Sequence, residues 1–386
     1  MFTLLVFIIV LGVLVFVHEL GHFVVARRNG VSAEEFGFGF PPRILGFYWD
    51  EKGKRKIVWG GRRVKAVGTI YSINWIPLGG FVKIVGEDGE EKNNPNSFAS
   101  KSPWTRVRML AAGVAMNFLL AGVLLSAVYF IGAPQVVEDN SSGILKNEKI
   151  QIIDVIKGSP AADMGIKIGD QVISAKTDSE PNSVFGSINE IQSYIHAHEG
   201  EKITFDIKRG NENLKLSGIP RKDYPADQGS LGISLAKTAE VSYPLPEAVW
   251  RGIKSTFEIT WLILTTFAQI ITRLLSGQGA GMDVSGPVGI AVLTGQVAHM
   301  GLVYVIQFMA LLSINLAIIN ALPIPALDGG RVLFVLIEAI KGSPVSQKFE
   351  QRAHNIGFAL LITLMVVVTF QDLMRFDVLS KVKALF

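Results

Sequence analysis

Two histidines and a glutamate stand at a fixed spacing near the end of the first apolar segment of this chain. His18 and His22 are four residues apart, and Glu19 directly follows the first of them. On an α-helix this spacing places both imidazoles on one face, one turn apart, where they can hold one metal ion. Glu19 then lies within reach of an attacking water as a general base. These residues predict a hydrolytic metal site.

A chance occurrence of the same pattern is the alternative, and the surrounding sequence argues against it. The apolar segment that precedes His18 contains no charged residue. Two imidazoles and a carboxylate at bilayer depth are costly, so such groups indicate a function by default. We therefore interpret the pattern as functional.

A third candidate ligand, Asp328, stands far along the chain, in a stretch where two prolines and two glycines break an apolar helix. A carboxylate at that depth is costly without a partner. Since the chain has no cysteine, a metal must be bound by His, Asp or Glu. His18, His22 and Asp328 provide three ligands and leave a fourth position open, as in catalytic zinc sites. The alternative is that Asp328 only ends a helix.

Two asparagines in apolar segments have two interpretations each. Asn320, before Asp328, can bind an extended substrate or stabilise an oxyanion, or it can cap the end of a helix. Asn117 is the one strongly polar side chain in the second apolar span. A hydrogen bond to another helix is the favoured role for it, and a role in the site is the alternative.

The composition indicates several membrane spans and a soluble part. The chain has 386 residues, of which 49% are hydrophobic and 18% are charged. The net charge of +4 is small, and no nucleic-acid partner is expected. Residues 1–26 lack the basic start of a signal peptide, so we interpret them as a retained helix. Four segments have the apolar character of spans: 2–26, 109–133, 300–322 and 357–370.

Charge placement predicts the orientation of these spans. The loop from Arg27 to Arg108 is rich in Lys and Arg, which makes it cytoplasmic and places both termini outside. The site then faces the cytoplasmic end of the membrane. The domain before Asp328 is predicted to lie outside. The chain must therefore cross the membrane once, and not twice, between that domain and Asp328 for Asp328 to reach the cytoplasmic end. The long helix predicted over 244–276 should therefore lie in the interface as an amphipathic helix.

The segment 64–85 is β-branched and aromatic, with Gly and Pro as breakers, and predicts a β-hairpin or small sheet. Its apolar content favours a position that dips into the bilayer beside the site, packed on helices because bare strand edges cannot face lipid. A plain cytosolic hairpin is an equal alternative.

Residues 134–242 are polar and rich in turn residues, which is typical of a soluble domain on the outside. We predict strands at 149–156, 171–175 and 202–208, and helices after Ser159 and over 188–196. The stretch 158–174 resembles the middle of a bacterial PDZ domain, with Gly165, Gly169 and Asp170 at its turn positions. Such domains capture peptide ends by strand addition.

The whole chain resembles the site-2 protease family, in its bacterial branch of sigma-factor-regulating proteases. Six motifs in the family's order carry the resemblance: His18 to His22, Gly37-Phe38-Gly39, Pro77 to Phe81, Ala112-Gly113 with Asn117, Ser285 to Ile290, and Asn320 through Leu327-Asp328-Gly329. The resemblance implies four transmembrane helices, a zinc site near the cytoplasmic side and cleavage of a peptide bond within a transmembrane segment.

The resemblance also implies how substrates are selected. A strand edge that carries Gly79, Gly80 and Phe81 would bind the substrate, and a periplasmic or extracellular PDZ domain would exclude bulky ectodomains. The substrates of the family are single-span anti-sigma factors, trimmed first by an upstream site-1 protease, and remnant signal peptides. This chain has one predicted PDZ domain where the best-known relatives have two in tandem, so any filter that needs two domains is in doubt.

The sequence thus predicts a polytopic α-helical membrane protein with four transmembrane helices, a membrane-associated β-hairpin or sheet and an inserted α+β PDZ domain. Its predicted parts are an N-terminal membrane half (1–133), the PDZ domain (134–236), an interfacial helix with a connector (237–299) and a C-terminal membrane half (300–386). A zinc endopeptidase of the cell (inner) membrane is the favoured function. A PDZ scaffold without activity and a metal transporter are the alternatives.

Overall fold

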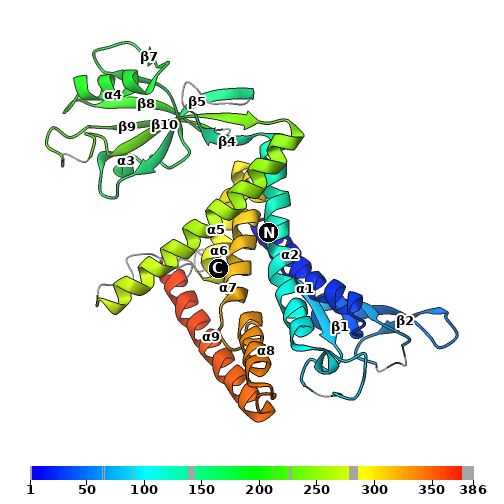
Figure 1. The fold of residues 1–386 in the computed structure, drawn as a ribbon. Helices are drawn as coiled ribbons and strands as arrows, with labels where there is room; N and C mark the ends of the chain where they lie inside the picture. The colour runs from blue at the N-terminus through cyan, green and yellow to red at the C-terminus, as the bar shows by residue number, and fades with distance from the viewer. Residues whose placement is uncertain are drawn as a thin grey trace, which may run out of the picture. The chain divides into compact units, whose positions relative to one another are not determined.

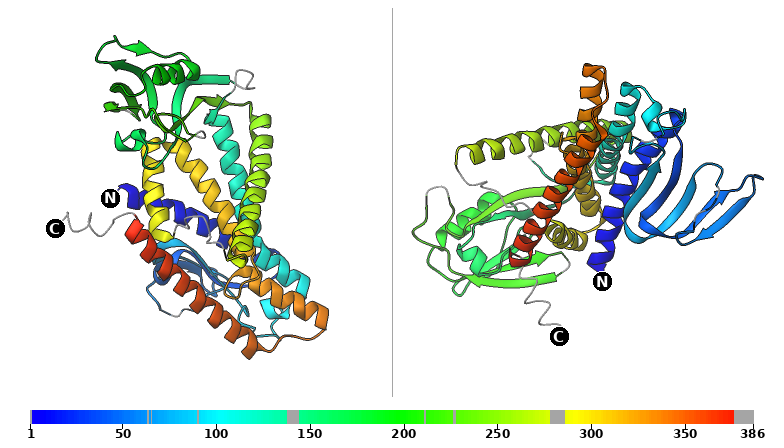
Figure 2. Two further views of the ribbon diagram at one scale, coloured as in Figure 1. Left: turned by 90° about the vertical axis from the view of Figure 1, so that its left-hand side faces the viewer. Right: turned by 90° about the horizontal axis from the view of Figure 1, so that it is seen from below.

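The computed structural model describes residues 2–62, 64, 66–89, 91–137, 144–210, 212–225, 228–277 and 286–375. The chain forms two compact units. The helical unit comprises Met1–Ala127 and Val249–Phe386, and the strand unit comprises Val128–Ala248. The long helices belong mainly to the helical unit (Figures 1 and 2).

Four helices are long and apolar enough to cross a membrane, and each overlaps one of the predicted spans. They are α1 (Phe2–Arg28), α2 (Pro103–Ile131), α7 (Leu302–Ala321) and α9 (Gln347–Arg375). Only 11–28% of the residues in their most apolar windows are buried inside the protein. Most apolar side chains of these helices therefore face outward. Such a surface is stable in lipid, whereas in water its exposure would be unfavourable.

Three further helices complete the helical unit: α5 (Leu245–Leu275), α6 (Pro287–Met300) and α8 (Asp328–Lys341). The helix predicted over 244–276 is present as α5. It packs through Ile259 and Ile263 on a buried cluster that contains Ala121 of α2 and Ile314 of α7. Helices α6 and α8 were not predicted. The α6 N-terminus is capped by Asp372, which accepts the N–H groups of Gly286 and Gly289 at 2.9 and 2.7 Å.

A small antiparallel sheet with the order β2-β1-β3 lies beside α1 (Figure 1). Its strands are β1 (Ala33–Trp49), β2 (Arg55–Trp59) and β3 (Ile70–Ile84). The segment predicted as a hairpin or small sheet is present as β3, one strand of this three-stranded sheet. β1 pairs with two parts of β3, Gly80–Lys83 and Ile70–Ile73, and lies between them. The partner strand was missed because three glycines and two prolines interrupt its apolar pattern.

The strand unit contains a seven-stranded sheet with the order β4-β10-β5-β6-β8-β9, and β7 pairs with β6. Its elements are β4 (Ala133–Val136), β5 (Ile144–Val155), α3 (Pro160–Asp163), β6 (Gln171–Thr177), β7 (Ser183–Val184), α4 (Ile188–Ala197), β8 (Ile203–Arg209), β9 (Glu212–Gly218) and β10 (Ile233–Ser242). The three predicted strands and two predicted helices are all present. The compact unit extends past the predicted limit of residue 236 because β10 continues to Ser242.

Candidate metal centre and active site

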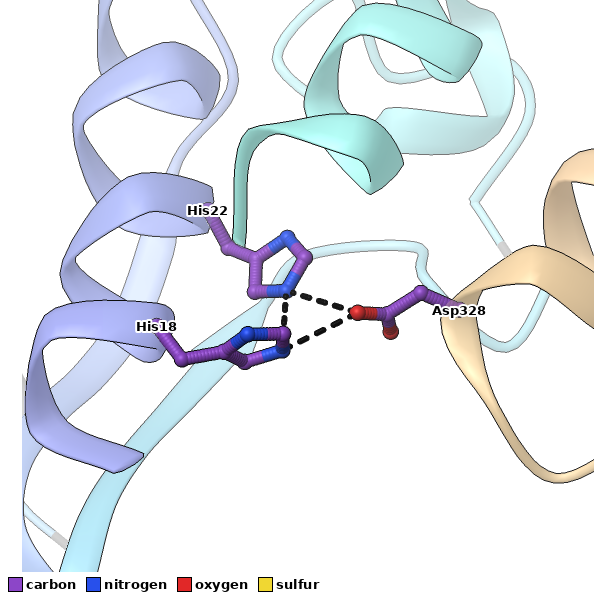
Figure 3. Close-up of side chains that lie close together, drawn as sticks. All are labelled: His18, His22 and Asp328. Carbon is purple, nitrogen blue, oxygen red and sulfur yellow. Dashed lines mark hydrogen bonds and ion pairs between the residues drawn. The ribbon is translucent and has the colours of Figure 1, made fainter. Parts of the chain in front are cut away.

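The two histidines of α1 are held with their rings side by side. His18 and His22 are 6% and 7% exposed. Their Nε2 atoms lie 3.2 Å apart, and both point away from the helix toward the same space (Figure 3). The four-residue spacing on a regular helix is sufficient for this arrangement.

Asp328 meets this pair from the first residue of α8. Its Oδ2 lies 3.0 Å from Nε2 of His18 and 3.3 Å from Nε2 of His22 (Figure 3). This oxygen is buried and has no hydrogen-bond partner in the described part of the chain. The structure therefore brings together the three residues that the sequence analysis selected as ligands, although Asp328 is more than 300 positions from the histidines.

The three atoms have the separations that a tetrahedral zinc site needs. Donors at about 2.0–2.1 Å from zinc lie about 3.3 Å from one another in a tetrahedron. The three measured separations are 3.0, 3.2 and 3.3 Å. Two imidazoles and one carboxylate are also a donor set that zinc accepts in catalytic sites. His18, His22 and Asp328 would hold the ion.

The opposite ring nitrogens are occupied by two groups of α2. Nδ1–H of His22 donates to the carbonyl oxygen of Met109 at 2.9 Å, which leaves the lone pair on Nε2. The side-chain amide of Asn117 lies 3.1 Å from Nδ1 of His18 and is fully buried. The amide oxygen of Asn117 otherwise has no partner, and an amide turned to present it would accept Nδ1–H of His18. Such contacts fix ring orientation and increase the basicity of the ligand nitrogen.

Asn117 therefore makes the helix-to-helix hydrogen bond that the sequence favoured, and its partner is one of the predicted metal ligands. Its isolation in an apolar span was the signal that could have identified this role. The sequence could not predict the hydrogen bond from His22 to the carbonyl of Met109, because every residue has a backbone carbonyl.

Two glycines allow α1 and α2 to approach closely at this point. A Cβ atom at Gly21 would lie 2.5 Å from the carbonyl oxygen of Ala112. A Cβ atom at Gly113 would lie 2.4 Å from Nε2 of His22 and 2.7 Å from Nε2 of His18. The absence of a side chain at 113 thus keeps open the space where an ion would lie.

The loop before α8 positions Asp328 by tight turns and one hydrogen bond. A Cβ atom at Gly329 would lie 2.3 Å from the carbonyl oxygen of Leu322, so the loop folds closely over this residue. Ala326 has a φ of +81°, which is unusual for a residue with a side chain. Its N–H donates to Nδ1 of His354 on α9 at 2.8 Å. The loop conformation is therefore determined by α9 as well as by its own sequence.

Charged residues around α8 line a cavity of about 820 Å³ that reaches Asp328. Arg331, one turn after Asp328, forms an ion pair with Glu87. At the other end of α8, Glu338 pairs with Arg106 of α2 at 2.5 Å. A polar cavity of this size admits water to the ligand cluster.

Glu19 lies between the ligand cluster and the sheet. Its side chain is half-buried and has no hydrogen-bond partner among the described residues. The bend of β3 packs against α1 here, since a Cβ atom at Gly80 would lie 3.2 Å from Cβ of Glu19, and one at Gly79 would lie 2.5 Å from Cβ of Val15. Phe81 follows and pairs with Gly37 of β1. The three predicted substrate-binding residues thus lie on the part of β3 beside Glu19.

Asn320 is half-buried near the end of α7, and it has no hydrogen bond within the described ranges. Six residues separate the end of α7 from Asp328, so Asn320 belongs to a different helix from the carboxylate. Neither predicted role of Asn320 is tested by these contacts. Ser285, the first residue of one motif of the resemblance, lies outside the described residues.

Comparison with known proteins gives a consistent assignment. A model of peptidase family M50 matches residues 6–364. The chain is 31% identical to the regulator of sigma-W protease RasP of Bacillus subtilis, over 97% of this chain and 98% of the relative. It is 30% identical to the zinc metalloprotease RasP of Geobacillus kaustophilus, with the same coverage. The family and the four apolar helices together indicate a multi-pass membrane protein. The chain belongs to peptidase family M50, and it is a zinc metalloprotease.

Proposed function

We propose that this chain cleaves a peptide bond inside the transmembrane segment of single-span membrane proteins. The observation that carries the proposal is the cluster of His18, His22 and Asp328, which joins a helix apolar enough to span with the start of α8. Arg27 and Arg28 end α1 five and six positions beyond His22, which supports a site near the cytoplasmic end of the membrane.

The residues of the site have distinct roles. His18, His22 and Asp328 hold the ion, and Asn117 and the carbonyl of Met109 orient the rings. When bound, zinc acts as a Lewis acid that acidifies water and polarises the scissile carbonyl. The Glu19 carboxylate takes a proton from the attacking water and passes it to the leaving amine nitrogen.

The edge of the small sheet provides a means of binding an extended substrate. β3 is a terminal strand in the order β2-β1-β3, and the part with Gly79, Gly80 and Phe81 lies beside Glu19. A substrate segment that unwinds can add to this edge through backbone hydrogen bonds, which places its peptide bonds next to the general base. Asn320 would bind this segment or stabilise the oxyanion.

The substrates of the proposal are anti-sigma factors that an upstream site-1 protease has trimmed, and remnant signal peptides. The name of the Bacillus subtilis relative, which connects it to sigma-W, supports the first class. The strand unit would act as a periplasmic or extracellular PDZ domain that excludes bulky ectodomains. Its support is the strand-helix-strand order around Ser159 to Thr177.

The test is cleavage of a model transmembrane substrate by the purified full-length protein, with and without a chelator. Glu19→Gln should lower the rate by about 10²–10⁴-fold, because general-base assistance is lost, while bound zinc remains unchanged. Glu201→Gln, the same change at an exposed position, is the matched control. Full activity of the Glu19→Gln variant contradicts the proposal. Full activity of the unmodified protein in the presence of the chelator contradicts it as well.

The same preparation separates the alternatives. Binding of peptides without cleavage would indicate a PDZ scaffold, and zinc uptake into vesicles would indicate a transporter. Substrates with short and with bulky ectodomains test the filter, since only the short ones should be cleaved. Equal cleavage of both would exclude a role of the strand unit in size selection.

A further inference from the structure

An apolar groove of about 320 Å³ lies on the face of the small sheet that adjoins α1, away from the ligand cluster. The side chains that define it are Phe16 of α1 and Phe38, Leu45, Phe47, Ile57 and Ile73 of the sheet. No residue of the proposed active site lines it. The groove is therefore a second feature of the helical unit, and it requires its own explanation.

The register of the strands explains why this face is apolar. Directly paired residues project from the same side of a sheet. The pairs Leu45 with Trp59, Phe47 with Ile57 and Phe47 with Tyr71 place large apolar or aromatic side chains together. A sheet face in water normally carries polar residues. An apolar molecule would therefore suit this face.

One cation lies at the rim of the groove. The guanidinium of Arg55 stands 4.4 Å from the ring centroid of Phe47, and Arg55 pairs with Trp49 across the ribbon. Arg55 has no carboxylate partner in the described part of the protein. Its neighbour Lys56 faces the other side and is paired with Asp50 at 3.0 Å. An apolar groove with one cation that lacks a carboxylate partner, counted over the described residues, complements a molecule that has an apolar chain and an anionic group.

The groove and the metal ligands lie on different sides of α1. Phe16 and His18 are two positions apart, which is about 200° around a helix. The groove therefore adjoins the side of α1 that is turned away from the metal ligands. It continues from the outer surface of a helix that spans the membrane, where lipid is the solvent.

We propose that this groove binds one anionic phospholipid, with an acyl chain along Phe47, Ile57 and Ile73 and the phosphate on Arg55. Trp49 and Trp59, 41% and 63% exposed, have the amphipathic rings that favour the headgroup region. The lipid covers the apolar face, and it holds in the membrane the sheet whose β3 edge lies beside Glu19. The binding itself does not depend on the proposed proteolytic role.

The experiment uses the full-length protein in nanodiscs of phosphatidylcholine with increasing amounts of phosphatidylglycerol brominated on its acyl chains. Bromine quenches nearby tryptophan fluorescence. The difference in quenching between the unmodified protein and Trp59→Phe is the contribution of Trp59, and it reports on the groove. We expect that part to saturate with phosphatidylglycerol and to reverse on addition of the unbrominated lipid. Brominated phosphatidylcholine at equal mole fraction should quench less.

Arg55→Gln should weaken the saturable binding by about ten-fold or more, because a charge-assisted hydrogen bond to phosphate is lost. Arg62→Gln is the matched control, since it removes the same charge from an exposed residue that does not line the groove. Equal losses in the two variants would show that only the general surface potential acts, and would overturn the proposal. Quenching that does not saturate, or competitive displacement of the lipid by an apolar transmembrane peptide, would overturn it as well.

Discussion

Buried polar residues gather at the ligand cluster of the helical unit, whereas the central cluster of the strand unit is apolar. Around the ligand cluster, His18, His22 and Asn117 are buried, while the long helices around them expose apolar side chains. In the strand unit, the central cluster consists of apolar residues such as Ile152, Ile191 and Phe205. The difference follows from the surroundings, because burial of apolar surface drives folding only where the alternative is water.

This comparison has a consequence for the role of each polar group. In a water-exposed domain a buried polar residue is usually a local structural device, as in the pair of Asp170 and Arg209 at 2.7 Å. In the membrane such a residue must be satisfied by other parts of the protein. The imidazoles meet this requirement through Met109 and Asn117, and the buried Asp328 oxygen without a hydrogen-bond partner would be satisfied by the ion. Mutations should therefore affect chemistry in one interior and stability in the other.

The largest effect is expected from Gly113→Ala. The added methyl group would lie 2.4 Å from Nε2 of His22, which is inside van der Waals contact, so the rings must move out of position. Bound zinc and proteolysis should both fall to background, measured by metal analysis and by substrate cleavage. Gly122→Ala on the same helix is the control, because its nearest neighbour is 3.8 Å away. A fully active Gly113→Ala protein would show that the ion does not lie there.

An intermediate effect is expected from Asn117→Ala. The change removes the partner of Nδ1 of His18 but leaves all three ligands, so zinc affinity should fall by about 10–100-fold. Competition with a chelator of known affinity measures this. Asn315→Ala is the control, since Asn315 bonds only to the carbonyl of Leu311 in its own helix. An unchanged zinc affinity would indicate that Asn117 serves only to join the helices.

The smallest effect on the site is expected from Phe205→Ala in the strand unit. Phe205 is 1% exposed, and its truncation should lower the free energy of unfolding of that unit by about 3–5 kcal/mol. Hydrogen exchange of the full-length protein should show faster exchange in β6 and β8, while zinc affinity stays constant. Val184→Ala, at a residue that is 74% exposed, should change neither quantity. A loss of zinc affinity in Phe205→Ala would contradict the division between the two interiors.

Local patterns were enough to predict much of this fold. Apolar runs predicted the spans in α1, α2, α7 and α9, and strand-like runs predicted β5, β6 and β8. The pattern failed for β1, where Gly37, Gly39 and two prolines interrupt the apolar residues of a strand that bends between two partners. It also failed for α8, since a helix that begins directly after Leu327 has no side-chain cap at its start.

The sequence by itself determined that His18 and His22 share one face of a helix, because helical periodicity is a local property of the backbone. It also indicated that Asp328 needs a partner, since an isolated carboxylate in an apolar stretch is costly. Only the tertiary structure decided that Asp328 lies 3.0 Å from His18, that Asn117 and Met109 occupy the opposite ring nitrogens, and that Gly113 leaves room between them. These contacts join residues 87 or more positions apart, and they depend on how closely whole helices approach, which no short pattern records.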